Sequence, residues 1–552
     1  MTSDSSNIRF KLDFNERSDH TPAWLSQATV ATDSLWCYPD RTQLEQTLCR
    51  DLGLQEGSLL LTNGGDEGID LLFKSSTINN TPLLIPEPCF SQYSHNAEIW
   101  RNDCRFIAVD PSRPLAINLS ALSQNLQANQ WLVITRPNNP TGEFINRQAL
   151  LALLTAAREQ QAKVFIDEAY IEFAVPEQAD DMFSAREYAA MGDVVVLRTF
   201  SKAFGLAGVR VGYLLGAPEL VNQFRRLAPP FNVSRVGLQL AEQAWQNRDQ
   251  ISEYTARIAA NRRLLTDQLT NYGVSVFPSQ GNFILFNTSD TMKTLLYSVL
   301  RRHGILIKTR LNGLPDAVRM TVPYDLTPLL TVLETIFAPQ QLAFDMDGVL
   351  IDTTDSYDQC IINTVSDLSD TQVTLKDVTA MRATGGYNND WDLSLALLKK
   401  QGYRGDLASV IPVFQAHYLG DQDTPGLIDR EKTLISQSLL ARLTDRQTAV
   451  VTGRPRSEAK MGLEKINWQP DTVISADDVS RQKPDPEGLL RLKNQNTDLK
   501  SGFWFVGDTV DDMQAGRAAG FICIGIGPNQ TLLTEAGADV VLDNVNQLES
   551  LL

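Results

Sequence analysis

The 552-residue sequence has few of the residues on which zinc enzymes and disulfide-rich proteins depend. Its four histidines show no HExxH spacing, which argues against a zinc site. Its six cysteines form no CxxC pair and are too sparse for a disulfide framework, so we expect reduced thiols in a cytoplasmic protein.

Long apolar runs and an excess of positive charge are missing as well. No run approaches the roughly 20 apolar residues that a membrane-spanning helix needs. The first stretch, MTSDSSNIRFKLDF, lacks the basic and then apolar layout of a signal peptide. The formal net charge is −17, which argues against nucleic acid or an anionic membrane as a partner. We therefore expect a soluble protein that acts on small molecules.

The sequence does contain short β-branched or apolar runs that alternate with longer amphipathic ones. WLVIT from residue 131, KVFIDEAY from 163 and FWFVGD from 503 are three such runs. This alternation predicts an α/β fold class built from βα units and mostly parallel sheets. Several runs end in a polar residue or a glycine, and ligands bind at that end of the strands in open α/β sheets.

The length favours several domains, and the sequence indicates one boundary. A helical pattern, LTPLLTVLETIF, ends at residue 337 and is followed by the short polar stretch APQQ. An apolar strand pattern with two aspartates, LAFDMD, begins at residue 342. We therefore expect one domain over residues 1–338 and a second over residues 342–552.

In the first domain, a lysine and an aspartate occur in the order and spacing that pyridoxal 5'-phosphate requires. Lys202 follows a strand in VVLRTFSKAFGLAG and would bind the cofactor covalently and move a proton at the substrate's Cα. Asp167 ends the strand in FIDEAYIEF and would keep the ring nitrogen of the cofactor protonated. Asn139 in RPNNPTG and Tyr170 would hydrogen-bond the ring oxygen.

The phosphate of the cofactor needs backbone N–H groups at a helix start together with positive charge. TNGGDEGIDLLF, from residue 62, offers such a helix start, and the segment around Lys202 offers a hydroxyl and a guanidinium. The predicted phosphate-binding residues are Gly65, Asp66, Glu67, Ser201 and Arg210.

Residues 8–337 resemble the fold-type I aminotransferases, and among these the histidinol-phosphate aminotransferase family. The resemblance rests on KLDFNE, GGDEG, RPNNPTG, FIDEAYIEF, LRTFSKAFGLAGVRVGY, QGNFILF and VRMTV. It implies a large, mostly parallel sheet with a small domain beside it. It also implies pyridoxal 5'-phosphate as the cofactor and the glutamate/2-oxoglutarate pair as the source and product of the amino group.

The same resemblance assigns three further residues. Phe90 would stack on the cofactor ring, and Arg319 in VRMTV would hold the anionic group of the substrate, a carboxylate or a phosphate ester. Tyr38 in CYPD would reach the cofactor phosphate of a neighbouring subunit, which implies a homodimer. Two departures concern the substrate: NERS at 15–18 stands where the family often has Asn-Glu-Asn-Pro, and Lys308 stands where it tends to have arginine.

Four motifs in the second domain supply the parts of a phosphoryl-transfer site. In FDMDGVL, Asp345 would attack phosphorus to form an aspartyl phosphate, and Asp347 would protonate the leaving oxygen and then activate water. Thr452 in VVTGRPRSE would donate a hydrogen bond to the phosphoryl oxygens. Lys483 in RQKPDPEGL would neutralise the phosphate and the nucleophile, and Asp508 in FVGDTVDDM would bind a metal.

Neighbouring carboxylates repel each other, so the second domain should hold a cation, and Mg²⁺ suits an all-oxygen site that also binds phosphate. The predicted ligands are Asp345, Asp347 and Asp508, with Asp512 behind them. The four motifs in this order resemble the haloacid dehalogenase-like superfamily, which implies a Rossmann-like domain. The second aspartate of FDMDGVL points to phosphate chemistry within that superfamily.

The segment between the first two of these motifs is mostly helical in pattern. It resembles the helical cap of subfamily I, at about residues 355–440, which closes over small substrates and excludes water. TGGYNNDWD at 384–392 is the candidate within it for substrate contact.

Together the two resemblances imply a bifunctional enzyme of histidine biosynthesis. The first domain would transfer an amino group from glutamate to imidazole acetol phosphate, and the second would hydrolyse the product, histidinol phosphate, to histidinol. Three alternatives stay open. Both chemistries could act on another small phosphorylated amino or oxo metabolite, the first domain could be a lyase like the threonine-phosphate decarboxylases, or the second could be a binding or regulatory module.

Overall fold

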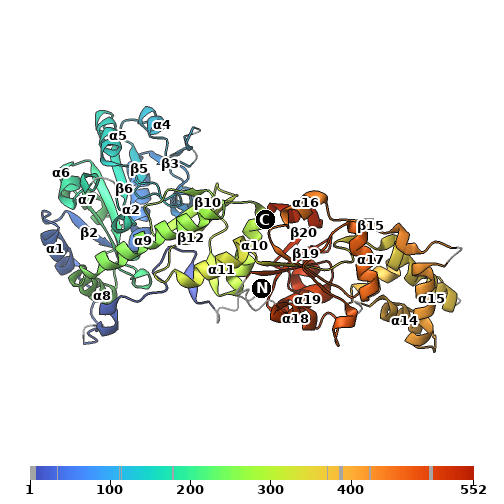
Figure 1. Ribbon diagram of the computed structural model, residues 1–552. Helices are drawn as coiled ribbons and strands as arrows, with labels where there is room; N and C mark the ends of the chain where they lie inside the picture. Colours follow the sequence, from blue (N-terminus) through green and yellow to red (C-terminus); the bar gives the residue numbers. More distant parts are fainter. Residues whose placement is uncertain are drawn as a thin grey trace. The chain divides into compact units, whose positions relative to one another are not determined.

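The computed structural model describes residues 8–33, 35–110, 112–113, 115–176, 179–369, 371–384, 389–421, 424–495 and 502–552. The chain divides into two compact units (Figure 1). Unit 1 comprises Met1–Thr288 and His303–Leu329, and unit 2 comprises Ser289–Arg302 and Leu330–Leu552. The predicted division at residues 338–342 follows the sequence motifs and stays a prediction, because the structure groups two earlier segments with unit 2.

Unit 1 is built on a seven-stranded sheet in the order β2-β8-β7-β6-β5-β3-β4. β8 runs antiparallel to both of its neighbours and the other pairs are parallel, which confirms the predicted mostly parallel sheet. In this order the strands are β2 (Leu59–Thr62), β8 (Gly212–Gly216), β7 (Val194–Thr199), β6 (Lys163–Asp167), β5 (Trp131–Thr135), β3 (Leu83–Pro86) and β4 (Cys104–Ile107).

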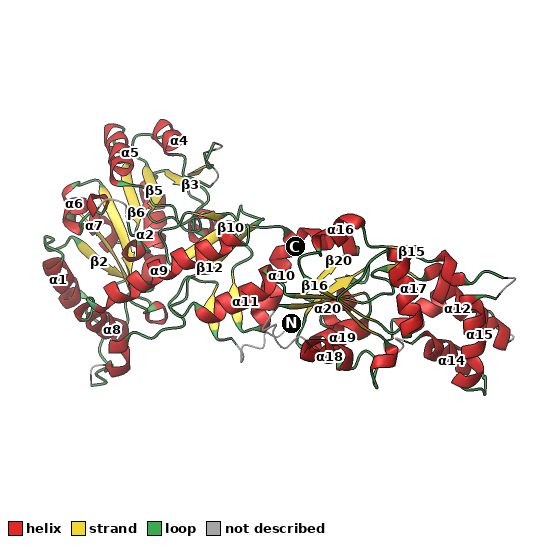
Figure 2. Cartoon of the chain, in the orientation of Figure 1, coloured by secondary structure: helices red, strands yellow, loops and turns green. Residues whose placement is uncertain are grey.

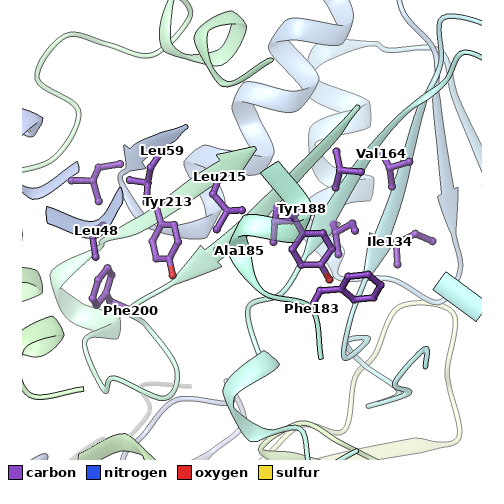
Figure 3. Packing of buried hydrophobic residues seen from close by; sticks show 14 of the residues in the cluster. Leu48, Leu59, Ile134, Val164, Phe183, Ala185, Tyr188, Phe200, Tyr213 and Leu215 are labelled. Carbon is purple, nitrogen blue, oxygen red and sulfur yellow. The ribbon is translucent and has the colours of Figure 1, made fainter. Parts of the chain in front are cut away.

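The central strands are apolar on both faces because apolar cores lie on both sides of the sheet. In β6, Val164 and Ile166 belong to one core cluster, whereas Phe165 belongs to the other. Successive side chains of a strand point to opposite faces, so one apolar run fills two cores. Figure 3 shows part of the first cluster, with Val164 near one end and Phe183 stacked on Tyr188.

Helix α5 (Arg147–Glu159) illustrates how the covering helices form. Asn146 caps it by accepting a hydrogen bond from the Ala149 N–H (2.9 Å). Apolar residues then recur at helical spacing and bury one face: Leu150, Leu153, Leu154 and Ala157. The other helices of unit 1 are α1 (Thr42–Asp51), α2 (Gly64–Asn79), α3 (Ser91–Trp100), α4 (Leu119–Gln124), α6 (Ala185–Ala190), α7 (Pro218–Arg225), α8 (Arg235–Gln246) and α9 (Gln250–Asn271).

Two smaller sheets complete unit 1. One is antiparallel, in the order β12-β10-β9, and the other pairs β1 with β11 in parallel. Their strands are β9 (Val276–Phe277), β10 (Phe283–Asn287), β12 (Ala317–Thr321), β1 (Phe10–Leu12) and β11 (Ile305–Ile307).

Unit 2 contains a six-stranded, wholly parallel sheet in the order β17-β16-β13-β18-β19-β20. The strands are β17 (Thr472–Ile474), β16 (Gln447–Val451), β13 (Gln341–Phe344), β18 (Phe503–Gly507), β19 (Ile522–Ile526) and β20 (Val540–Leu542). The chain builds one side of the sheet from β13 to β17 and then the other side from β18 to β20. This doubly wound order confirms the Rossmann-like prediction and places the switch point between β13 and β18.

A helical insertion lies between β14 (Ile351–Asp352) and β15 (Lys432–Thr433), which pair antiparallel at its base. Its helices α12 (Gln359–Leu368), α13 (Leu375–Arg382), α14 (Asp390–Lys400) and α15 (Leu407–Leu419) share a core of their own (Figure 2). We call this insertion the cap. The remaining helices are α16 (Gln437–Arg442), α17 (Arg456–Ile466), α18 (Glu487–Gln495), α19 (Val510–Ala519) and α20 (Gln530–Ala536).

Helix α10 (Asp290–Arg302) also belongs to unit 2, and α11 (Thr327–Phe337) leads into β13. Asp539, next to β20, binds α10 through Arg302 (3.2 Å) and the Ser298 hydroxyl (2.9 Å). The indole of Trp504 in β18 donates to the Thr335 carbonyl of α11 (2.9 Å). In the described part of the chain, no helix is both long enough and apolar enough to span a membrane.

Candidate active sites

A cavity of about 360 Å³ in unit 1 lies where β6 and β7 end. Parallel strands place the residues that follow them at one edge of the sheet, so segments distant in sequence meet there. Ten of the predicted residues line this cavity: Gly65, Asp66, Phe90, Asn139, Asp167, Tyr170, Ser201, Lys202, Arg210 and Arg319.

Lys202 follows β7 and carries the amine of this cavity. Its Nζ donates a hydrogen bond to the Phe14 carbonyl oxygen (2.9 Å) and lies 5.4 Å from the centre of the Tyr170 ring. The Tyr170 hydroxyl in turn accepts hydrogen bonds from Asn139 Nδ2 (3.4 Å) and Asn15 Nδ2 (3.2 Å). The Lys202 amine therefore lies beside Tyr170, whose hydroxyl is bonded to Asn139. These two side chains were predicted to hydrogen-bond the ring oxygen of the cofactor.

Asp167 ends β6 and is buried. Its carboxylate accepts hydrogen bonds from the Tyr93 hydroxyl (3.0 Å) and the Ala169 N–H (3.0 Å), and both donors are neutral. Burial raises the pKa of Asp167 to about 6. A protonated ring nitrogen in the cavity would stabilise this carboxylate, so the site fits pyridoxal 5'-phosphate.

The predicted phosphate-binding end of the cavity is the start of α2. The Arg210 guanidinium reaches it and pairs with Asp66 (2.6 Å). Gly64 has φ +74°, a backbone conformation that favours glycine, and a Cβ there would lie 2.5 Å from Arg210 Nη2. The Ser201 hydroxyl accepts a hydrogen bond from Thr199 Oγ1 (2.9 Å) at the same edge.

Two predicted residues lie away from the cavity lining. The Glu67 carboxylate accepts hydrogen bonds from Asn232 Nδ2 (2.6 Å) and from the Asn63 N–H, so its side chain supports the turn before α2. Tyr38 is 77% exposed and stacks on Phe231, with the ring centres 4.4 Å apart. Its predicted contact with a neighbouring subunit stays a prediction.

Arg319 in β12 is buried, and two of its three guanidinium nitrogens have hydrogen-bond partners. Nη1 donates to Asn139 Oδ1 (2.6 Å) and Nη2 to the Asp13 carbonyl oxygen (2.7 Å). Within the described residues Nε has no hydrogen-bond partner, although it is shielded from solvent. A buried donor without an acceptor is costly, so an anion in the cavity would complete the set.

The two departures from the family pattern lie around the same cavity. Asn15 of NERS is buried, and its backbone N–H donates to Thr321 Oγ1 (3.0 Å). Lys308 lies 5.4 Å from the ring centre of Phe14, which lines the cavity. Both positions can therefore influence which substrate the cavity accepts.

In unit 2, Asp345 directly follows β13 and Asp508 directly follows β18, so they meet at the switch point of the sheet. The Asp345 N–H donates to the Val506 carbonyl oxygen (2.8 Å), which fixes the end of β13. Lys483 Nζ lies 2.8 Å from Asp345 Oδ1 and 2.5 Å from Asp512 Oδ1. Burial, with the nearby carboxylates, raises the pKa of Asp345 although Lys483 opposes this.

Asp345, Asp508 and Asp512 each offer a carboxylate oxygen, and these oxygens lie within 4.8 Å of one another. Asp508 Oδ1 is shielded from solvent and has no hydrogen-bond partner among the described residues. Burial and the two neighbouring carboxylates raise the pKa of Asp508 well above its ordinary value. Lys483 alone supplies too little positive charge for three carboxylates, so the donor set fits a hard divalent cation.

Close packing behind this group depends on Gly348. Its φ is +72°, and a Cβ there would lie 2.0 Å from Asp508 Oδ2. The turn after Asp347 therefore leaves room for the carboxylate of Asp508.

Asp347 lies apart from that oxygen group and is paired with an arginine. Arg454 Nη2 lies 2.6 Å from Asp347 Oδ1, and Nε donates to the same oxygen (2.8 Å). The role of Asp347 as a metal ligand stays a prediction. Thr452 follows β16, and its Oγ1 accepts a hydrogen bond from the Arg454 N–H (3.1 Å).

The cap contributes a charged group of its own. Arg382 binds both Asp358 and Asp390, at 2.7 Å each. Burial raises the pKa of Asp390 to about 6, and the charge of Asp347 adds to the shift. Of the predicted contact segment 384–392, residues 385–388 lie outside the described residues.

Residues 11–333 match the family model described as Aminotransferase class I and II. The chain belongs to this aminotransferase family. It is 30% identical over 293 residues to the histidinol-phosphate aminotransferase of Bacillus pumilus, which covers 52% of this chain and 79% of that protein. It is 31% identical over 315 residues to the histidinol-phosphate aminotransferase of Bacillus velezensis, which covers 55% and 86%.

The fold of the aminotransferase part is that of solved relatives. The histidinol-phosphate aminotransferase of Clostridium acetobutylicum aligns with a TM-score of 0.54 and 24% identity, over 59% of this chain and 99% of that one. Residues 342–526 match the model described as Haloacid dehalogenase-like hydrolase. One chain therefore joins an aminotransferase to a hydrolase of this type, and the two families imply pyridoxal 5'-phosphate and a divalent metal.

Several residues of both sites were not predicted from the sequence. Tyr93 of the aminotransferase lies in the stretch PCFSQY, three residues after Phe90, but carried no predicted role. Arg454 follows Thr452 by two residues in VTGRPR, and this arginine within a motif was the available signal. Glu431 of the hydrolase, which binds Arg454 (2.8 Å), had no local signal at all.

Proposed function

We propose that the chain is a bifunctional enzyme that forms a phosphorylated amine and then removes its phosphate. Unit 1 would transfer an amino group from glutamate to imidazole acetol phosphate, and unit 2 would hydrolyse histidinol phosphate with Mg²⁺. The observation that carries this proposal is the buried Arg319, whose Nε has no partner among the described residues and is thus suited to an anionic substrate. The similarity to histidinol-phosphate aminotransferases supports the choice of substrate.

In unit 1, pyridoxal 5'-phosphate, when bound, would supply the electron sink that lets the Cα–H bond of the amino substrate break. Lys202 would hold the cofactor, and its Nζ would take the proton from Cα and return it. Asp167 would hold the proton on the ring nitrogen by its negative charge. Arg319 would bind the carboxylate of glutamate or the phosphate of the partner substrate in turn, since a guanidinium can bind either in bidentate fashion.

In unit 2, an oxygen of Asp345 would attack phosphorus while the bond from phosphorus to the ester oxygen breaks. Asp347 would give its proton to that leaving oxygen. Asp347 would then take a proton from water, whose oxygen attacks phosphorus and releases phosphate and the free Asp345 carboxylate. Thr452 and Lys483 would hold the phosphoryl oxygens throughout, and a bound Mg²⁺ would offset the negative charge of the carboxylates.

We further propose that the enzyme is cytoplasmic, acts in histidine biosynthesis and works as a homodimer. An exposed aromatic pair, Tyr38 on Phe231, supports the last point, because large exposed aromatic side chains often mark an interface. Size-exclusion chromatography with light scattering tests it, and a monomer at micromolar concentration would contradict it.

The test of the activity is phosphate release from histidinol phosphate by the purified full chain with Mg²⁺, beside a panel of other small phosphate esters. We expect a clear preference for histidinol phosphate and, with 2-oxoglutarate added, formation of glutamate. A preference for another ester would move both chemistries to a different metabolite. Release of CO₂ without an amino acceptor would support the lyase alternative, and the absence of phosphate release from every ester would support the regulatory one.

A further inference from the structure

A single buried arginine holds the side chain of Asp347. Arg454 lies in the turn after β16, and its side chain is 1% exposed. Two of its nitrogens approach the same carboxylate oxygen, Nε at 2.8 Å and Nη2 at 2.6 Å. The Asp347 side chain is 30% exposed, so it faces the open site while the guanidinium supports it from inside.

The guanidinium is itself fixed from the opposite side. Nη2 donates to Glu431 Oε1 (2.8 Å), and Nη1 donates to the Tyr418 hydroxyl (3.1 Å). The Tyr418 hydroxyl donates in turn to Glu431 Oε1 (3.1 Å). The Tyr357 ring covers the group, with its centre 4.9 Å from the guanidinium carbon. Since Glu431 is buried and holds Arg454 independently of Asp347, the guanidinium is a fixed support.

The fixing groups come from the two places where the chain enters and leaves the cap. Tyr357 lies just before α12, Tyr418 lies in α15, and Glu431 lies just before β15. Tyr357 and Tyr418 stack with their ring centres 4.5 Å apart. Ser356 adds a hydrogen bond to Glu431 Oε1 (3.1 Å). The position of Arg454, and with it that of Asp347, therefore depends on the base of the cap.

We propose that Arg454 is a positioning residue for phosphate-ester hydrolysis, which aims the carboxyl group of Asp347 at the leaving oxygen and ties its position to the cap base through Glu431 and Tyr418. This inference rests on the proposed function of unit 2. In the first step the proton passes from Asp347 to the ester oxygen as the phosphorus–oxygen bond breaks. A carboxyl group that is displaced from the leaving oxygen loses most of this assistance, because proton transfer depends steeply on distance and direction.

A purely structural ion pair would have a different consequence from a positioning one. An alkoxide is a poor leaving group and needs its proton, whereas nitrophenolate leaves without one. A loss of positioning therefore slows the first turnover of an alkyl phosphate and spares that of p-nitrophenyl phosphate. A loss of folded protein slows both esters equally.

The experiment uses the full-length chain with Mg²⁺, glycerol 2-phosphate as the alkyl ester and p-nitrophenyl phosphate as the aryl ester. Arg454→Lys keeps the positive charge. A single ammonium group cannot bind Asp347, Glu431 and Tyr418 at once, as the planar guanidinium does. We expect its kcat for the alkyl ester to fall about 100-fold with KM nearly unchanged, whereas nitrophenolate release in the first turnover falls less than about 5-fold. Because the later water step also uses Asp347, a burst of nitrophenolate should precede slow turnover.

Two other variants complete the design. Arg456→Met, at the start of α17, removes an arginine that is 55% exposed and pairs with Asp478, and both esters should react as in the wild type. Glu431→Gln removes the charge that fixes Arg454 and should reproduce the alkyl-selective loss at a smaller size, about 10-fold. It also serves as the second probe should Arg454→Lys fail to fold.

The possible results distinguish the positioning role of Arg454 from the proposed function of unit 2. The decisive quantity is the ratio of the first-turnover rates for the alkyl and the aryl ester. If this ratio is the same as in wild type in both Arg454→Lys and Glu431→Gln, the positioning role is overturned. Wild-type protein that hydrolyses neither these esters nor histidinol phosphate would instead remove the proposed function on which the inference rests. A wild-type protein that is active, with the selective loss in both variants, would support both.

Discussion

Asp167 in unit 1 and Asp345 in unit 2 occupy matching places at the ends of central parallel strands, yet their partners differ. Asp167 accepts hydrogen bonds from a hydroxyl and an amide, which are neutral. Asp345 has the Lys483 ammonium 2.8 Å away and two more carboxylates close by. The aminotransferase part gives its buried carboxylate neutral donors only, whereas the hydrolase part places a lysine and two further carboxylates around Asp345. These arrangements agree with the cationic ring nitrogen and the divalent metal that the two families imply.

Asp539 of unit 2 shows what a buried carboxylate looks like when no ligand is involved. Its side chain is fully buried and binds Arg302 (3.2 Å), Arg517 (3.1 Å), the Ser298 hydroxyl (2.9 Å) and the Cys523 N–H (3.0 Å). Two cations and two neutral donors satisfy it completely. The difference lies in the number of cations: Asp539 binds two arginines, Asp345 shares the single ammonium of Lys483 with Asp512, and both hydrogen-bond donors of Asp167 are neutral.

The largest expected effect separates the two units. Lys202→Ala removes the amine that would hold the cofactor and move the proton, so transamination should fall at least about 1,000-fold and the visible absorbance of the bound cofactor should disappear. Phosphate-ester hydrolysis by the same preparation should be unchanged. Lys163→Ala, at the start of β6 and outside the cavity lining, is the matched control. Loss of both activities in Lys202→Ala would mean that the sites are not independent.

The converse change tests the hydrolase site. Asp345→Asn removes the carboxylate proposed to attack phosphorus, so phosphate release should fall about 1,000-fold while transamination persists. The exposed Asp355, which pairs with Lys432 outside the site, gives the control variant Asp355→Asn with wild-type rates. Phosphate release that survives in Asp345→Asn would exclude Asp345 as the nucleophile.

The sequence predicted those parts of the fold and sites that local pattern encodes. Asp167, Asp345 and Asp508 lie at strand ends, as predicted. The prediction was possible because in each case an apolar run and the aspartate that ends it are adjacent in sequence. The parallel sheets followed from the alternation of short apolar runs and amphipathic segments.

The partners of these residues were not predictable in the same way. Arg454 meets Asp347 across 107 residues of chain, and Tyr93 meets Asp167 across 74. Such pairs depend on how strands are ordered and where the cap is inserted, which no local spacing records. The grouping of α10 with unit 2 through Asp539 was missed for the same reason, since the helix pattern alone does not say which core it joins.

A moderate effect on stability is expected when Asp539, the carboxylate bound by two arginines, is changed. Asp539→Asn leaves Arg302 and Arg517 without their shared charge, and because both arginines are partly exposed the cost should lie at the low end for a buried pair, about 3 kcal/mol. Hydrogen exchange of peptides from α10 and β19 should accelerate, whereas peptides from β6 in unit 1 should exchange as before. Asp543→Asn, at an exposed position bonded to Gln547, is the control. Unchanged exchange in α10 would mean that this ion pair contributes little to holding the helix.

The smallest expected effect concerns Asp167 in unit 1, a buried carboxylate whose two hydrogen-bond donors are neutral. Because burial raises the pKa of Asp167 to about 6 in the folded protein, the folded state binds this proton more tightly than the unfolded state does. The contribution of Asp167 to the stability of the cofactor-free protein should therefore be largest at about pH 4 and below, and should fall by up to about 3 kcal/mol as the pH rises to 6, with little change above that.

Thermal unfolding of the cofactor-free chain between pH 4 and 8 measures this loss, and Asp167→Asn should lack that part of the pH dependence. Tyr93→Phe removes a hydroxyl that stabilises the charged form, so it should extend the loss of stability to higher pH. Addition of pyridoxal 5'-phosphate should reverse the loss in wild type, since a cationic ring nitrogen offers the partner that the fold withholds. Identical pH profiles for wild type and Asp167→Asn would mean that the carboxylate is already neutralised within the protein, and the contrast with Asp345 would then disappear.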